Sequence, residues 1–306
     1  MDVIIVCHTE FGFVRDKKVI PDKKAVLGVK DGVFNLIKIA EKYNAKISFA
    51  VCPEVVECFP KNITHEIGLH IHPGWEKLGK EDYYVGDTYL REHCKQSSSS
   101  SVLWSYPYFE QFEMIKTGKE YITEKLGVVP KFFVAGRWCI NNDTVKALVV
   151  NGFTHDCSIP PGNKNEHMDY SRLSRICMPY NPSSNDYQVE GDVPLLLTPT
   201  SQCWRIGSVN PEMIPVVGLL WLKACFIEYY NQGAPLFHIC LHSPSMTDNY
   251  LSSGMDGLLF FISKHKNINF KFASEIGEYP QVKTKTDLLP YIFAINKNIL
   301  ATFLKI

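Results

Sequence analysis

Apolar runs alternate with amphipathic stretches along most of the chain, a pattern typical of a sheet covered by helices. Residues 3–7 are continuously apolar, as expected for a strand that is buried on both faces. Residues 31–44 place apolar side chains on one face and charged side chains on the other, which predicts a helix that Asp31 and Gly32 open. Residues 46–52 form the next apolar run, and Pro53 follows it. This order of strand, helix and strand predicts a parallel sheet.

The same unit recurs toward the carboxyl end of the chain. The pattern predicts helices at residues 109–126, 144–151, 211–231 and 256–264, and strands at residues 131–137, 153–158, 193–197, 235–241 and 268–272. No linker divides the chain, and a single α/β barrel reaches a length of 306 residues. We therefore predict one α/β domain over residues 1–306, with residues 281–306 as a C-terminal extension.

Two regions lack this periodicity. Residues 83–108 contain five consecutive serines, at 97–101, which predict a mobile surface loop. The aromatic residues that follow, Trp104, Tyr106 and Tyr108, either line a sugar-binding lip or pack the loop down, and the sequence favours neither. Residues 159–201 are rich in Pro, Asn and Ser, and so long a loop inside a compact domain is usually functional.

Residues 65–75 contain three histidines within eight positions. Ile67, Leu69 and Ile71 alternate with polar residues, which predicts a strand with His70 and His72 on the same side. Two imidazoles on one face of a strand end suit a divalent metal, because neutral histidine nitrogen is a common zinc ligand. The alternative is a polar strand whose histidines bond to backbone, but the spacing favours a metal site.

Polar residues also end other predicted strands. Because the carboxyl ends of parallel strands meet at one edge of the sheet, we expect these side chains to lie close together. They are His8 with Glu10, His70 with His72, Arg137, Asp156 and His242.

Composition narrows the function further. The chain has 32 basic and 32 acidic residues, so its balanced charge gives no indication of a nucleic-acid or anionic-membrane partner. The amino terminus lacks the basic region of a secretory signal, and no apolar run is long enough to cross a bilayer. The ten cysteines are scattered without a Cys-x-x-Cys pair, which predicts reduced thiols of a cytoplasmic protein and does not indicate a cysteine metal site.

The order of these strand ends resembles that of the polysaccharide deacetylase family, also called the NodB-homology or carbohydrate esterase 4 family. The resemblance covers roughly residues 3–280. In that family a stretch such as His-Glu-Ile-Gly-Leu-His supplies the metal histidines, and residues 65–70 match it, with His72 two positions on. Ala-Gly-Arg at residues 135–137 and Leu-His at residues 241–242 match later motifs. The form of the histidine stretch looks most like the surface-polysaccharide biosynthesis branch.

The resemblance implies a distorted (β/α)7-type barrel and a metal-dependent hydrolase that removes an N-acetyl or related acyl group from a carbohydrate or glycan precursor. It implies a divalent ion, expected to be Zn²⁺ from the ligand types, held by Glu10, His70 and His72. The role of general acid falls on His242, and Arg137 corresponds to the family residue that orients the base.

Two departures from the family pattern leave alternatives open. The family's metal histidines are usually four residues apart, so either the spacing is shortened or His65 replaces one of them. The usual base is an aspartate, and here it is His8, which either accepts the proton or serves as a fourth metal ligand. A catalytically inactive, sugar-binding member of the family and another metal-dependent amidohydrolase are therefore alternatives to an active deacetylase.

Overall fold

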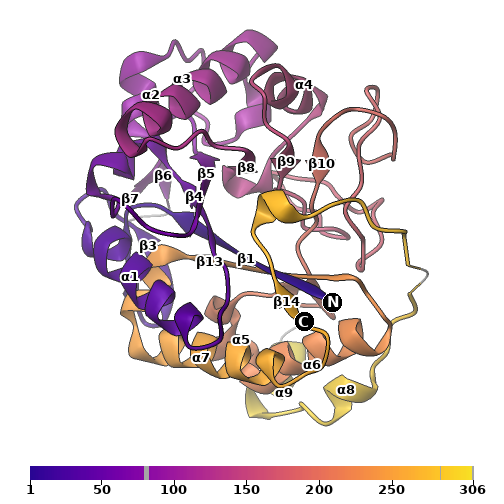
Figure 1. Ribbon diagram of the computed structural model, residues 1–306. Helices are drawn as coiled ribbons and strands as arrows, with labels where there is room; N and C mark the ends of the chain where they lie inside the picture. The colour runs from indigo at the N-terminus through magenta and orange to yellow at the C-terminus, as the bar shows by residue number, and fades with distance from the viewer. Residues whose placement is uncertain (79–82, 283, 305–306) are drawn as a thin grey trace.

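A curved sheet of parallel strands forms the centre of the molecule in a computed structural model of the chain (Figure 1). The structure describes residues 1–78, 83–282 and 284–304. The sheet has the order β10-β9-β8-β5-β4-β1-β13, and β14 pairs with the start of β1. Its strands are β1 (Asp2–Thr9), β4 (Ser48–Val51), β5 (Glu66–Ile71), β8 (Phe132–Ala135), β9 (His155–Asp156), β10 (Leu196–Leu197), β13 (Leu236–His242) and β14 (Asn269–Phe270).

The gap between the two ends of this sheet is bridged by the segment that follows β10. The backbone N–H of Ser201 donates to the His238 carbonyl at 3.2 Å, and the N–H of Cys240 donates to the Val209 carbonyl at 3.1 Å. The segment therefore links β10 to β13 without forming a regular ladder with it. This arrangement confirms the predicted single-domain α/β fold with a distorted barrel.

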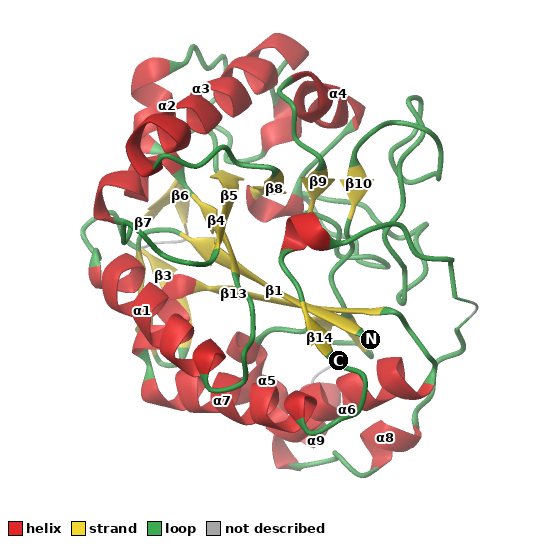
Figure 2. Cartoon of the chain, in the orientation of Figure 1, coloured by secondary structure: helices red, strands yellow, loops and turns green. Residues whose placement is uncertain are grey.

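Helices surround the sheet on the outside, as Figure 2 shows. They are α1 (Leu27–Glu41), α2 (Thr88–His93), α3 (Tyr108–Leu126), α4 (Asn142–Val150), α5 (Ile214–Val217), α6 (Leu219–Asn231), α7 (Asn249–Ser263), α8 (Leu289–Ile292) and α9 (Lys297–Leu304). Short 3-10 turns lie at η1 (Pro53–Cys58), η2 (Leu103–Ser105), η3 (Gly136–Trp138), η4 (Pro211–Met213), η5 (Ser243–Thr247) and η6 (Ala273–Glu275). Because helices cover the sheet, its strands are buried; the side chains of residues 3–7 are fully inaccessible to solvent.

Among the described residues, three antiparallel strand pairs lie apart from the central sheet. They are β2 (Gly12–Arg15) with β3 (Lys18–Pro21), β6 (Glu76–Leu78) with β7 (Tyr83–Val85), and β11 (Gln202–Cys203) with β12 (Gly207–Ser208). The first two pairs follow directly on the strand ends that carry Glu10 and His72, so they build the wall beside those residues.

Several predicted helix limits were wrong. Helix α1 begins at Leu27 rather than at Asp31, and Gly32 lies inside it. Gly32 is required by close packing, because a Cβ there would lie 2.1 Å from the carbonyl oxygen of Ser243. Helix α7 begins at Asn249 rather than at Asp256, since the Asp248 carboxylate caps it by accepting two backbone N–H groups.

The long helix predicted at residues 211–231 is broken in two. Gly218 has φ 81° and ψ 154°, a conformation that only glycine adopts readily, and α5 ends there while α6 begins. The two parts, Pro211–Val217 and Leu219–Asn231, bend by 115° and together are long and apolar enough for a membrane span. Within the described residues, no single helix meets that condition.

The serine-rich loop lies at the surface, as composition predicted, with Ser97, Ser98 and Ser99 exposed, while its end is held in place by hydrogen bonds. Ser101 is fully buried, and its hydroxyl donates to the Glu76 carboxylate. The hydroxyl of Tyr106 donates to the carbonyls of Ser98 at 2.9 Å and Ser100 at 2.7 Å. Tyr106 therefore packs the loop down, which decides between the two roles left open for it.

The C-terminal segment, residues 284–304 in the described part, packs against α5 and α6. Tyr291 is 1% exposed, packs against Trp221 with ring centroids 4.7 Å apart and ring planes tilted by 53°, and donates its hydroxyl proton to Glu228 at 2.8 Å. Glu228 also pairs with Arg175. The predicted extension over residues 281–306 is therefore tied to the body of the molecule through one buried aromatic residue and one buried carboxylate.

Candidate active site

The carboxyl ends of β1 and β13 bring His8 and His242 together. The two strands pair in parallel with His8 directly opposite His242, so both side chains emerge at the same level. Their rings lie 5.0 Å apart, nearly perpendicular. Glu10 follows the end of β1, where the strand no longer continues. Strand register alone thus fixes three of the side chains predicted for the site.

The carboxyl end of β5 supplies the other two imidazoles. His70 lies opposite Val134 of β8, and its Nδ1 contacts the Val134 carbonyl at 2.9 Å, which leaves Nε2 directed inward without a hydrogen-bond partner. His72 lies just beyond the strand end against Gly136, where an added Cβ would come within 2.3 Å of His72 Nδ1. The glycine of the Ala-Gly-Arg stretch therefore provides the space that the His72 ring occupies.

Glu10 is the carboxylate that these histidines share. Its Oε2 lies 3.3 Å from His72 Nε2 and 3.9 Å from His70 Nε2, and its Oε1 lies 3.7 Å from His242 Nε2. Burial by itself raises the pKa of the Glu10 carboxyl, but the hydrogen bond with His72 and the surrounding imidazoles hold that pKa well below its usual range. Glu10 is therefore an anion at neutral pH.

His242 is paired with a second buried carboxylate, that of Glu212. His242 Nδ1 lies 2.9 and 3.0 Å from the two Glu212 oxygens, and the His242 backbone N–H donates to the same carboxylate at 2.7 Å. Ser245 donates a further hydrogen bond to Glu212. Burial alone would lower the pKa of His242, but the Glu212 and Glu10 carboxylates raise it to about 9. His242 is thus protonated at neutral pH, with Nε2 directed at Glu10.

His8 has the opposite electrostatic character. It is 4% exposed, and burial together with the neighbouring His70 and His242 lowers the pKa of His8 well below its usual value. The indole of Trp138 packs against its ring at a centroid distance of 4.9 Å. His8 is therefore a neutral imidazole at neutral pH, and its Nε2 has no hydrogen-bond partner.

Arg137 lines the same cavity as His8 and Glu10. It adopts a left-handed conformation with φ 57°, as does Trp138 with φ 58°. Ser101 has the largest effect in lowering the pKa of Glu76, and the charge of Arg137 contributes to the same shift. The guanidinium thus acts on the β6 side of the cavity, while the adjoining Trp138 covers His8.

A cavity of about 330 Å³ opens over these side chains. Asn165 and His167, from the long loop over residues 159–201, form part of its rim, and Trp104 holds that loop by donating its indole N–H to the His167 carbonyl at 2.7 Å. The lining residues are His8, Glu10, Pro21, His70, His72, Val85, Ala135, Arg137, Trp138, Asn165, His167 and His242. All six predicted site residues therefore border one cavity.

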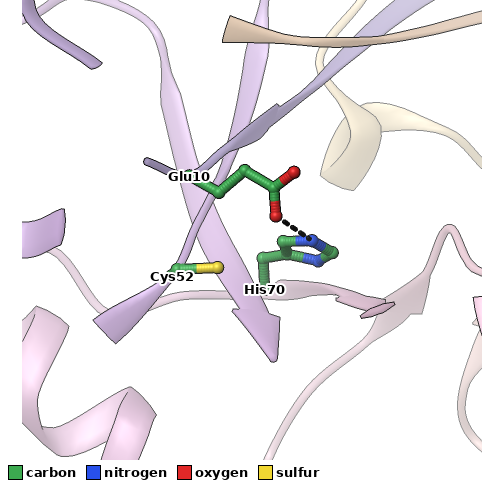
Figure 3. Close-up of side chains that lie close together, drawn as sticks. All are labelled: Glu10, Cys52 and His70. Atoms are coloured by element: carbon green, nitrogen blue, oxygen red, sulfur yellow. Dashed lines mark ion pairs between the residues drawn. The ribbon is translucent and has the colours of Figure 1, made fainter. Parts of the chain in front are cut away.

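The donor atoms in this cavity fit a divalent cation. In the described part of the molecule, His8 Nε2 and His70 Nε2 are buried without hydrogen-bond partners, which is costly unless another group engages them. A carboxylate oxygen of Glu10, the Cys52 sulfur and a ring nitrogen of His70 lie within 4.8 Å of one another, and they are the one such trio within the described parts of the chain (Figure 3). Carboxylate, imidazole and thiolate together are the ligand types of zinc.

Two other polar residues named by the sequence lie outside this cavity. His65 stands at the amino end of β5, where its Nδ1 accepts the Ile47 backbone N–H at 3.3 Å, so it does not replace a metal histidine. Asp156 is buried beneath the sheet edge and accepts hydrogen bonds from the backbone and hydroxyl of Ser158. Burial raises the pKa of Asp156 to about 7.

Sequence reasoning missed two residues of the site. Glu212 comes from a turn 30 residues before His242, inside a region that the periodicity assigned to a helix. The cysteine spacing predicts a reduced core thiol at Cys52, and the structure has a free, buried thiol there, but the spacing did not reveal that this thiol lies beside Glu10 and His70. A signal for Cys52 was present, however, since it directly follows the strand between those that carry Glu10 and His70.

Comparison with solved structures identifies the fold. A structure from Mycobacterium smegmatis assigned as a polysaccharide deacetylase superposes with a TM-score of 0.55 at 17% identity, covering 92% of this chain and 95% of that one. The PuuE allantoinase gives 0.56 at 15% identity, covering 90% and 88%. A structure from Pseudomonas aeruginosa PAO1 assigned as a polysaccharide deacetylase gives 0.53 at 16% identity, again covering 90% and 88%.

This chain therefore has the fold of the polysaccharide deacetylases, which confirms the fold that the sequence motifs predicted. Neither the scan against protein-family models nor the search of curated proteins found a match.

Proposed function

We propose that this chain is a metal-dependent hydrolase that removes an N-acetyl or related acyl group from a carbohydrate or a glycan precursor. The observation that carries the proposal is the convergence of an anionic Glu10, a protonated His242 and a neutral His8 on one cavity. Amide hydrolysis needs a group that accepts a proton from water and one that donates a proton to the departing amine. Neighbouring groups with pKa values shifted in opposite directions suit those two tasks.

Glu10, His70 and His72 would hold the divalent ion, with zinc the expected metal. When bound, that ion activates water and polarises the acyl carbonyl. His70 is suited to the role because burial, followed by the effect of His72, lowers its pKa to about 3, so it offers a neutral nitrogen over the whole physiological range. The Val134 carbonyl fixes the ring through the other nitrogen, in the manner usual for metal-binding histidines.

In the proposed reaction the C–N bond of the amide breaks, the oxygen of water joins the acyl carbon, and a carboxylate and an amine are released. His8 accepts a proton from the attacking water, which a neutral imidazole can do. His242 donates its Nε2 proton to the departing nitrogen. Glu212 acts through His242, because its carboxylate keeps Nδ1 protonated and directs the ring toward the cavity.

The substrate class rests on the deacetylase fold and on the cavity, not on a bound sugar. The allantoinase among the similar structures favours allantoin as a second candidate substrate on the same fold. A panel of N-acetylated oligosaccharides, N-acetylated sugar nucleotides and allantoin separates the two. Release of acetate supports the proposal, and turnover of allantoin alone would replace it with the amidohydrolase alternative.

The roles are tested with His72→Ala, His242→Ala and His8→Ala, and His93→Ala serves as a control because His93 lies on α2 outside the cavity lining. His72→Ala is expected to lose bound metal. His242→Ala and His8→Ala are expected to keep the metal and lose turnover by about 10²- to 10⁴-fold, the usual contribution of a positioned acid or base.

Metal content is measured by elemental analysis, and turnover is measured as acetate release. Unchanged turnover in all three cavity variants would refute the proposal. Loss of metal from His8→Ala would show that His8 is a metal ligand, which is the alternative to the role of base. A wild-type protein that binds sugar and metal without releasing acetate would be the inactive, sugar-binding form.

A further inference from the structure

The carboxyl ends of three adjacent strands meet at the trio drawn in Figure 3. Thr9 of β1 lies opposite Val51 of β4, so the next residues, Glu10 and Cys52, leave neighbouring strands at the same level. Val51 in turn lies opposite Leu69 of β5, so Cys52 also stands beside His70. The position of Cys52 between the two proposed ligands therefore follows from the register of the sheet.

Cys52 borders the proposed metal site although its side chain is buried. It is 2% exposed, yet it lines a small cavity together with Glu10 and His72. In the close-up its sulfur points toward His70, and the Glu10 carboxylate lies above the His70 ring (Figure 3). His70, itself 1% exposed, directs its unpartnered Nε2 toward Glu10 at 3.9 Å. The Glu10 carboxylate, the Cys52 sulfur and the His70 nitrogen, all possible metal-binding groups, thus surround the same small volume.

We propose that the Cys52 thiolate is a ligand of the metal that Glu10 and His70 hold. This inference rests on the proposed metal centre, and it adds a sulfur ligand to it. A purely structural thiol is the alternative, because buried cysteines commonly serve as small apolar residues. Against that alternative, the Cys52 sulfur lies within 4.8 Å of both a Glu10 carboxylate oxygen and a His70 ring nitrogen, so that one cation can engage all three groups.

The ligand set also has a consequence for the choice of metal. A thiolate ligand favours zinc or cobalt over magnesium or manganese, which prefer oxygen ligands.

If His72 also binds the metal, a sulfur ligand from Cys52 changes how many protein groups surround the ion. Glu10, Cys52, His70 and His72 together offer four protein donors, and four protein ligands close a tetrahedral zinc site. Metal binding and acetate release must therefore be measured separately, since a metal-loaded protein is not by itself an active one.

The test uses the full-length protein stripped of metal and titrated with Co²⁺ alone. A thiolate bound to Co²⁺ gives an intense charge-transfer band in the near ultraviolet, which carboxylate and imidazole ligands do not give. We expect the band in the wild-type protein and in Cys58→Ser, a matched control in the following turn η1. We expect Cys52→Ser to lose it and to bind cobalt at least about tenfold more weakly.

Circular dichroism checks that each variant is folded. A wild-type protein that binds Co²⁺ without the band overturns the inference regardless of how Cys52→Ser folds, and so does a band that persists in folded Cys52→Ser. The failure of the proposed function is distinct, because it would be a wild-type protein that shows the band but releases no acetate. Acetate release without the band would leave the function standing and remove Cys52 from the ligands.

Discussion

At the scale of single residues, the site depends on how burial and charge give different protonation states to the imidazoles of His8, His70 and His242. Glu212 and Glu10 keep His242 charged, whereas burial and neighbouring imidazoles keep His8 and His70 neutral. Similar side chains thereby acquire different chemical capacities within one cavity. The sequence alone placed these histidines at strand ends, but their protonation depends on partners that only the folded chain brings close.

Replacing Glu212 by Gln is expected to move the alkaline limb of the pH profile. His242 must be protonated to act as an acid, so activity is present below its folded-state pKa of about 9 and is lost as pH rises through that value. Glu212→Gln removes the negative charge that does most to raise the pKa of His242, while the charge of Glu10 remains. The pKa of His242 therefore falls, and the alkaline limb moves to lower pH. The measurement is kcat/KM against pH, with the exposed Glu278→Gln as a control. An alkaline limb at the same pH in both variants would contradict the assignment.

At the scale of secondary-structure elements, the positions of the strand ends were predictable, but the helix limits and the residues that pack against the strand ends were not. The strands of the central sheet follow from apolar runs, and the period-two alternation placed His70 and His72 on one side. The predicted helix limits were wrong where close packing or backbone conformation sets them. Gly32 packs against Ser243 inside α1, and the left-handed Gly218 separates α5 from α6. Glu212 was missed because its importance comes from one contact with a strand 30 residues later.

The turn η3 offers a prediction at this scale, because Gly136 makes room for His72. Gly136→Ala would place a Cβ 2.3 Å from His72 Nδ1, so the ring must leave the position in which its Nε2 lies 3.3 Å from Glu10. We expect zinc affinity to fall by about 10- to 100-fold, the size of the effect when a ligand loses its orienting neighbours. Calorimetric titration of metal-free protein with Zn²⁺ measures it. Gly277→Ala, which meets no atom within 4 Å, is the control, and equal affinity in the two variants would show that the ring is not held there.

At the scale of the whole molecule, the barrel is completed by parts without regular structure. The segment after β10 bridges to β13 through isolated backbone hydrogen bonds, and the C-terminal residues cover α5 and α6. Neither role could be predicted from periodicity, since both depend on where distant segments end up. The single-domain α/β architecture was predictable, because apolar runs of strand length alternate with amphipathic helical stretches along most of the chain.

The attachment of the C-terminal segment is tested with Tyr291→Phe. The change removes the hydroxyl that donates to the buried Glu228 carboxylate and leaves the aromatic packing on Trp221. We expect the free energy of unfolding in urea to fall by about 1.5–3 kcal/mol, the usual value for a hydrogen bond to a charged group. Phe293→Ser, at an 80% exposed position two residues away, is expected to change it by less than about 0.5 kcal/mol. Equal effects of the two changes would show that Glu228 does not anchor the segment.

The pairing of β1 with β13 has a consequence for anyone who wishes to transplant this chemistry. His8 and His242 sit opposite each other on one continuous ladder that runs from Asp2 with Leu236 to the two histidines. A recipient scaffold with two adjacent parallel strands in that alignment would inherit their mutual placement directly. A shift of the ladder by one position would turn one imidazole to the other face of the sheet, so alignment errors in such a graft would abolish the arrangement rather than weaken it by degrees.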